Sequence, residues 1–76
     1  MQSLTRGAVA LRSRRLSEGL SQYQWATRLN ITPSYISQIE RGVVIPGQLL
    51  LERLRDALRI PVAWWATIDE KRAAKR

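Results

Sequence analysis

The sequence has no cysteine, no histidine and few acidic residues. Without cysteine, disulfide bonds and thiol catalysis are excluded, and without histidine the usual general base is missing. A structural zinc site would need carboxylates alone, which is an unfavourable donor set. No run approaches the roughly 18–20 apolar residues of a membrane span, and residues 1–15 lack the apolar block of a signal peptide. We therefore expect a cytoplasmic protein with no metal, no cofactor and no enzymatic activity.

Positive charge is the strongest signal in the composition. Thirteen basic residues against six acidic ones give a net charge of +7 over 76 residues. This balance favours a polyanionic partner, either nucleic acid or an anionic membrane surface. The basic first helix lacks aromatic residues on its apolar side, and the core needs that side, so nucleic acid is preferred over a membrane. A chain of this length builds one hydrophobic core.

Apolar residues at helical spacing predict an all-α fold of five helices, and no segment has the alternating pattern of a strand. The first helix spans about residues 4–18, and Gly7 is expected to weaken its first turn. The fourth spans residues 48–58 with a leucine stripe, and the fifth spans about residues 61–68. The predicted stripe of the first helix consists of Ala8, Leu11, Arg15 and Leu16.

The second and third helices are joined by a very short connection. Ser21 and the glutamine three residues later form a capping box, so the second helix begins there, and it closes at Asn30. Thr32 caps the third helix, Pro33 occupies its first position, and Gly42 follows its end. Two short helices joined by about three residues form a helix-turn-helix unit.

The third helix has an apolar side and a polar side on a wheel of about 100° per residue. The polar side carries Ser34, Ser37, Gln38 and Arg41, and no acid. Hydroxyl, amide and guanidinium groups are those that contact base edges and phosphates in DNA. An ordinary solvent-exposed helix surface is the alternative explanation of the same residues.

Two features of the first and second helices add to this interpretation. The second helix starts at Ser21 and Gln22, where backbone N–H groups and the positive dipole end favour a phosphate. Arg15 lies on the apolar stripe of the first helix, and Glu40 flanks the buried side of the third. A partly buried ion pair would explain both charges and gives Glu40 a structural rather than a catalytic role.

The run ITPSYISQIERG at residues 31–42, with Ser21-Gln22 and Trp25-Ala26, resembles lambdoid-phage repressor and Cro proteins, the Xre-type helix-turn-helix family. The resemblance covers about residues 11–65. It implies a five-helix repressor-like bundle that binds operator DNA as a two-fold homodimer, usually as a repressor. The DNA-binding domain is then residues 1–69. The basic residues 70–76 form a tail, either a solubilising segment or an arm along the DNA.

The resemblance also assigns roles to single positions. Base-reading positions fall at the start of the third helix and one turn later. Gln22 is expected to touch phosphate and to support that helix. Arg15 is expected to pair with Glu40. With Ser37 added from the helical wheel, the predicted base-reading residues are Thr32, Pro33, Ser34, Ser37 and Gln38. The predicted phosphate-contacting residues are Ser21, Gln22, Tyr35, Arg41, Val43 and Arg14.

Two positions depart from the family pattern. The loop at residues 43–45 is Val-Val-Ile, without the Lys or Arg that many members use to hold phosphate. We therefore expect the backbone N–H of Val43 or Val44 to contact phosphate. The positive charge is expected to come from Arg41, Arg14 and the Arg-rich outer side of the first helix. Pro33 has no donor, so it offers only apolar contact to a thymine methyl, and more of the specificity rests on DNA shape.

The tryptophans give expectations for the core and for a dimer. Trp25 lies on the inner side of the second helix and is expected in the core. Trp64 and Trp65 are neighbours and point in different directions. The resemblance places Trp64 in the core, so Trp65, with Ile68, is expected to face outward as a dimer contact. The alternative for Trp65 is partial cover by the tail.

The sequence therefore predicts a sequence-specific double-stranded DNA-binding transcriptional regulator, a homodimeric repressor that reads the major groove with residues 32–41. The alternative is an antitoxin-type or other protein-binding module in which DNA binding is secondary. The partner surface of such a module would consist of Trp65, the apolar loop at residues 43–45 and the tail. The absence of charge from that loop favours this alternative. Copurification of a second polypeptide would discriminate between the two.

Overall fold

The computed structural model describes residues 4–68, which form four α-helices and one 3₁₀ helix. In chain order these are α1 (Arg6–Ser17), α2 (Gln22–Leu29), α3 (Pro33–Glu40), α4 (Gln48–Leu58) and η1 (Val62–Ala66). The predicted all-α class is confirmed. The expected fifth α-helix is instead the short 3₁₀ helix η1. The predicted tail, residues 70–76, lies outside the described residues.

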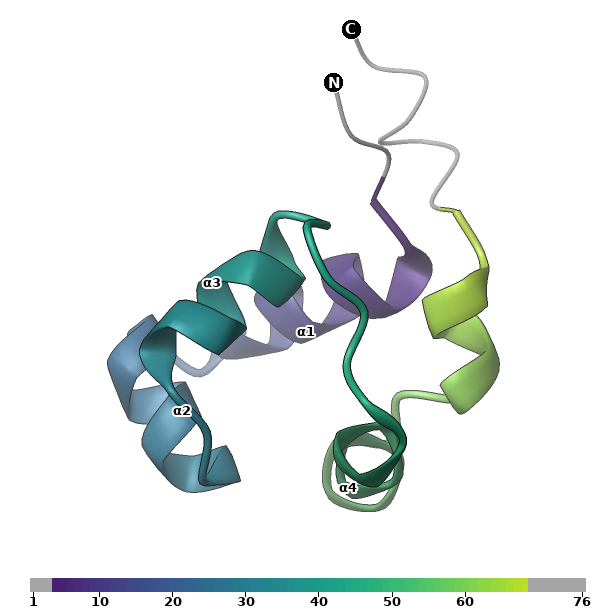
Figure 1. The fold of residues 1–76 in the computed structure, drawn as a ribbon. Coiled ribbons are helices and arrows are strands. Elements are labelled where there is room, and N and C mark those ends of the chain that lie inside the picture. Colours follow the sequence, from purple (N-terminus) through teal and green to yellow (C-terminus); the bar gives the residue numbers. More distant parts are fainter. Residues whose placement is uncertain (1–3, 69–76) are drawn as a thin grey trace, which may run out of the picture.

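The helices pack as two groups that share α1. In Figure 1, α2 and α3 lie side by side at one end of the molecule and η1 lies at the other, while α4 is seen end-on below them. Near η1, the Arg6 N–H donates to the Thr67 carbonyl at 2.7 Å, and Thr5 and Ile68 form a single antiparallel bridge. Among residues 4–68, no helix is both long and apolar enough to cross a membrane.

The predicted caps fix the starts of α2 and α3. The Ser21 hydroxyl accepts from the Gln24 N–H at 3.1 Å, and the Gln24 side-chain oxygen accepts from the Ser21 N–H at 2.8 Å, which completes the capping box. Thr32 caps α3 by accepting from the Tyr35 N–H at 3.1 Å. Asn30 adopts a left-handed conformation with φ 61° and closes α2. The connection between the two helices is therefore as short as the sequence predicts.

The end of α3 is closed by a Schellman motif around Gly42. Gly42 has φ 79°, its N–H donates to the Ile39 carbonyl at 3.1 Å, and the Val43 N–H donates to the Gln38 carbonyl at 2.9 Å. The left-handed conformation costs a glycine little because it has no Cβ. The chain then leaves α3 through the apolar loop toward α4.

The core lies between α1 and the other helices. Trp25 is buried as predicted, and so is the stripe of α1, except that Leu16 is exposed. The buried apolar residues are Ala8, Leu11, Trp25, Ala26, Leu29, Ile36, Ile39, Leu50, Leu54, Leu58, Ile60 and Trp65.

The prediction for the two neighbouring tryptophans is wrong. Trp65 is only 3% exposed and lies in the core, so it does not face outward as a dimer contact. Its ring packs on Gly7, where an added Cβ would lie 2.3 Å from a ring carbon. Trp64 is half-buried under the Arg6 guanidinium, whose central carbon is 4.3 Å from the ring centroid. The missing side chain at Gly7 therefore decides which tryptophan enters the core.

Gly7→Ala is expected to destabilise the protein by about 1–3 kcal/mol, because the new methyl group overpacks the core against the Trp65 ring. The intrinsic helix preference of alanine, worth about 1 kcal/mol in the opposite direction, is too small to offset the clash. Urea unfolding followed by tryptophan fluorescence measures the change. Gly47→Ala is the matched control because a Cβ there meets open space. Equal stability of the two variants would contradict the packing described.

Candidate nucleic-acid interface

The polar side of α3 faces solvent as the helical wheel predicts. Ser34 and Arg41 are exposed, Ser37 and Gln38 are half-buried, and Ile36 and Ile39 are fully buried on the opposite side. Thr32 and Pro33 are exposed at the start of the helix. The five predicted base-reading positions thus lie at the accessible start and side of one short helix.

A buried ion pair holds α3 on α1. The Arg15 guanidinium donates to both oxygens of Glu40, from Nε to Oε2 at 2.7 Å and from Nη2 to Oε1 at 2.9 Å, and from Nη1 to the Leu20 carbonyl at 2.9 Å. The hydrogen bond to Glu40 raises the pKa of Arg15 above its ordinary value, although burial opposes the shift. The predicted structural pair between Arg15 and Glu40 is therefore present, and it is bidentate.

Gln22 joins the start of α2 to the same ion pair. Its side-chain nitrogen donates to Glu40 Oε1 at 3.1 Å, so the amide supports α3 as the sequence predicts. Ser21 stands beside it as the N-cap. One carboxylate therefore receives hydrogen bonds from α1 and α2 and fixes both against the end of α3.

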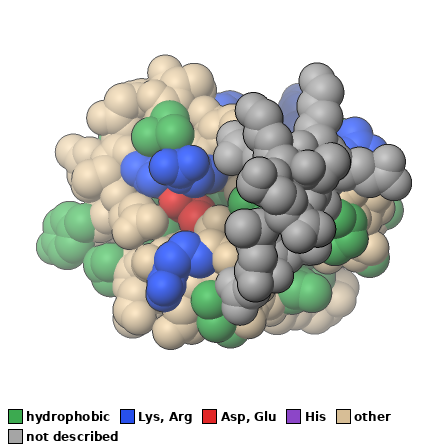
Figure 2. Space-filling view, turned by 90° about the horizontal axis from the view of Figure 1, so that it is seen from above, with side chains coloured by type: hydrophobic (Ala, Val, Ile, Leu, Met, Phe, Trp, Pro, Cys, Tyr) green, Lys and Arg blue, Asp and Glu red, His purple; other side chains and the backbone are tan. Residues whose placement is uncertain are grey.

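A hollow of about 570 Å³ opens at this junction. It is lined by Leu4, Arg12, Arg15, Gln22, Ser37, Glu40 and Arg41, which come from the start of the chain and from α1, α2 and α3. Figure 2 shows acidic atoms between two groups of basic side chains on this face. The hollow thus borders the polar side of α3 and brings three arginines around one carboxylate.

Two of the remaining predicted phosphate contacts are held near α3. The Tyr35 hydroxyl accepts from the Gly47 N–H at 3.2 Å, which leaves its own hydrogen available for donation. Arg41 is exposed, and its Nε donates to the Ser37 carbonyl at 3.3 Å, so the guanidinium lies back along the helix. Both side chains therefore lie beside α3 with donors that are not used in these two hydrogen bonds.

Two residues predicted to contact phosphate have other hydrogen-bond partners in the structure. The Val43 N–H closes the end of α3 by donating to the Gln38 carbonyl, so it has no hydrogen left for a phosphate. Arg14 pairs with Glu18 at 2.7 Å and donates to the Leu58 carbonyl at 3.4 Å, at the end of α4. The hydrogen bond from Arg14 is also the main cause of a lowered pKa at Glu18. Arg14 therefore lies outside the group around the hollow.

Sequence reasoning placed Arg12 on the Arg-rich outer side of the first helix but did not single it out as a site residue. Arg12 stands one helical turn before Arg15, so the two share a side of α1, whereas Arg14 does not. Arg12 Nε lies 4.0 Å from Glu40 Oε1, and half of the Arg12 side chain is exposed. The i, i+3 spacing was the signal that could have separated Arg12 from Arg14.

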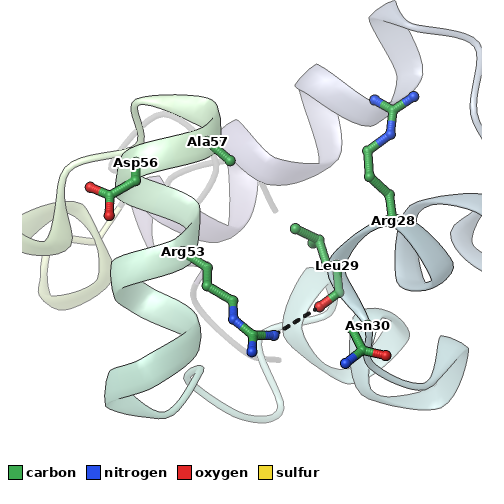
Figure 3. A pocket seen from close by; sticks show the side chains of 6 residues that line it. All are labelled: Arg28, Leu29, Asn30, Arg53, Asp56 and Ala57. Atoms are coloured by element: carbon green, nitrogen blue, oxygen red, sulfur yellow. Dashed lines mark hydrogen bonds between the residues drawn. The ribbon is translucent and has the colours of Figure 1, made fainter.

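A second hollow, of about 530 Å³, lies between the end of α2 and α4. Figure 3 shows Arg53 of α4 reaching the Leu29 carbonyl of α2, a hydrogen bond of 3.2 Å. Its other lining residues are Arg28, Asn30, Asp56 and Ala57. None of the residues predicted to touch DNA lines it, so it lies apart from the candidate interface.

Comparison with known proteins agrees with this arrangement. A helix-turn-helix family model matches residues 11–65. The chain therefore belongs to the Xre-type helix-turn-helix family, a class of DNA-binding transcription regulators. A search of curated protein sequences finds no significant match.

One similar solved structure is the clp gene regulator ClgR from Corynebacterium glutamicum. The two sequences are 31% identical, and their structures superpose with a TM-score of 0.63. The match covers 82% of this chain. The chain spans 66% of the length of the ClgR chain.

Glu40→Gln is expected to cost about 3–5 kcal/mol of stability, because it leaves the Arg15 charge buried without its partner. Replacing both residues, in Arg15→Met/Glu40→Leu, should recover most of that loss, since two apolar side chains bury no unpaired charge. Urea unfolding of the two variants, with Glu52→Gln as a control for a carboxylate on the surface of α4, measures both effects. A loss below about 1 kcal/mol for Glu40→Gln would contradict a buried, strongly coupled pair.

Proposed function

We propose that the protein is a sequence-specific double-stranded DNA-binding transcriptional regulator of the cytoplasm, a homodimeric repressor and not an enzyme. The observation that carries the proposal is the polar, acid-free exposed side of α3, held at a fixed angle by the Arg15–Glu40 pair. Membership of the Xre-type helix-turn-helix family supports it. Occupation of an operator that overlaps a promoter is sufficient for repression.

In this proposal α3 enters the major groove and its side chains meet base edges. Gln38 offers an amide that pairs with adenine through two hydrogen bonds, Ser34 and Ser37 offer hydroxyls, and Pro33 packs on a thymine methyl. The single acid of α3, Glu40, is turned inward with its side chain 2% exposed, so it does not repel the DNA. The burial of this carboxylate leaves the exposed side of α3 free of negative charge.

The start of α2 would lie against the DNA backbone. The N–H groups of Gln22 and Tyr23 point out of the first turn, and the positive end of the helix dipole attracts a phosphate. The hydroxyl groups of Ser21 and Tyr35 are further proposed phosphate contacts. These contacts set the position of α3 in the groove, whereas base contacts set the sequence preference.

Selection of bound duplexes from a random DNA pool at near-physiological salt tests the proposal. We expect an enriched two-fold motif with half-sites about one helical turn apart. Binding without enrichment that falls steeply with salt would contradict sequence-specific recognition, because net charge alone produces that behaviour.

Gln38→Ala is expected to relax the preference at one base pair of each half-site and to weaken binding by about 1–3 kcal/mol. Gln48→Ala, which removes the same amide from α4, is the matched control, since the Gln48 side chain donates to Glu52 within α4. Fluorescence anisotropy with duplexes that vary one base pair at a time measures both variants. An equal effect of the two changes would contradict base reading by α3.

The homodimer needs a contact other than Trp65, which is buried. Of the two residues predicted for the interface, Ile68 remains available, with 43% of its surface exposed. We expect Ile68→Asp to weaken binding to a duplex with two half-sites about tenfold or more, an energy loss of at least ~1.4 kcal/mol. Binding to a single half-site should be unchanged. Equal losses on both duplexes would place the effect of Ile68 outside dimer formation.

A second candidate function, a protein-binding module, is favoured by one observation. The loop after α3 and the start of α4 expose the apolar side chains of Val43, Ile45 and Leu49, the last two by 60% and 66%. Copurification of a second polypeptide in fixed ratio, lost in Ile45→Asp/Leu49→Asp while DNA binding persists, would favour this candidate. A single species at the mass of this chain or its dimer would favour the regulator.

A further inference from the structure

The hollow where α1, α2 and α3 meet carries more positive than negative charge. Arg12 and Arg15 come from α1, Arg41 follows α3, and Glu40 is the one carboxylate that lines the hollow within residues 4–68. Three guanidinium groups thus surround one carboxylate. The distribution of their hydrogen bonds decides which of these charges is available to a ligand.

The charge of Glu40 is already balanced inside the protein. Its oxygens accept from Arg15 at 2.7 and 2.9 Å and from Gln22 at 3.1 Å, and its side chain is 2% exposed. Arg12 approaches Oε1 only to 4.0 Å, at the outer limit of an ion pair. Arg15 therefore neutralises Glu40, and Arg12 contributes little to that pair.

Arg12 and Arg41 line the hollow, and among residues 4–68 both keep donors without a hydrogen-bond partner. Half of the Arg12 side chain is exposed, and Arg41 uses its Nε on the Ser37 carbonyl at 3.3 Å. Ser37 itself lines the hollow and belongs to the polar side of α3. An anion seated here would meet two guanidinium groups and one hydroxyl next to the helix that enters the groove.

We propose that this hollow holds one phosphate of the DNA backbone, with Arg12 and Arg41 as its guanidinium donors and Glu40 as a positioning residue. The inference rests on the proposed function and extends the DNA-binding surface to Arg12 of α1. A guanidinium fits a phosphate because its N–H groups form a planar fork. The Glu40 oxygens that face the hollow do not exclude the anion, because the Arg15 charge offsets them. The site also replaces the basic loop that the chain lacks after α3.

The competing explanation is that Arg12 only adds to the ion pair of Glu40. A contact of 4.0 Å between a half-exposed arginine and a carboxylate contributes little in water. The two explanations differ in what Arg12→Gln changes. Loss of a phosphate contact lowers DNA affinity and its salt dependence, whereas loss of an ion pair lowers only the stability of the fold.

The test compares Arg12→Gln with Arg14→Gln on one duplex across a range of salt concentrations. Both variants remove one positive charge from α1, but Arg14 points to Glu18 and the end of α4. For Arg12→Gln we expect the slope of log K against log salt to fall by about 0.9 in magnitude, which corresponds to an affinity loss of about eightfold at 0.1 M salt. Arg14→Gln should keep the wild-type slope, and Arg12→Lys should restore most of the slope.

Two results would overturn the inference. Equal changes in the two glutamine variants would show that net charge alone matters. A shift of the urea midpoint in Arg12→Gln with wild-type DNA affinity would assign Arg12 to the ion pair. A scrambled duplex, measured in the same way, separates failure of this inference from failure of the proposed function. If the wild-type protein binds the selected and the scrambled duplex equally well, sequence-specific recognition is rejected. The difference in salt slope between Arg12→Gln and Arg14→Gln tests the phosphate contact on either duplex, whether or not recognition is sequence-specific.

Discussion

The bidentate ion pair between Arg15 and Glu40 is the interaction on which the rest of the structure depends. It joins residues 25 positions apart, and Gln22 donates to the same carboxylate, so three helices meet at one buried group. Desolvation makes such a pair a weak source of net stability, but its geometry is demanding. Its main effect is therefore to fix the angle at which α3 leaves the body of the domain.

The same pair determines the electrostatics of the exposed surface. Because Glu40 is turned inward and neutralised, the accessible side of α3 presents hydroxyl, amide and guanidinium groups without an opposing acid. The end of α3 is closed by backbone hydrogen bonds around Gly42, and these bonds occupy the N–H groups of Gly42 and Val43. In the proposed complex, positive charge for the DNA backbone comes from Arg12 and Arg41, beside the helix, rather than from the loop that follows it.

Local signals predicted the helices well. The capping residues Ser21 and Thr32 and the glycine after α3 mark helix ends through hydrogen bonds to near neighbours, so sequence alone locates them. The partnership of Arg15 and Glu40 followed from a charge on an apolar stripe and from the family resemblance. The tryptophans could not be assigned in this way, because Gly7, 58 positions before Trp65, provides the space that the ring fills. Gly7 looked like a weakness in α1, but the packing of the core requires it.

In the proposed function, the exposed side of α3, the start of α2 and Arg12 form one DNA-binding surface. The most direct measurement is an NMR titration of the ¹⁵N-labelled protein with a short duplex that contains the selected half-site. We expect the largest shifts at residues 33–41, at Gln22 and at the side chain of Arg12, with little change in α4 and η1. Largest shifts at residues 43–49, with α3 unaffected, would contradict the proposed surface and would make the apolar loop the functional surface.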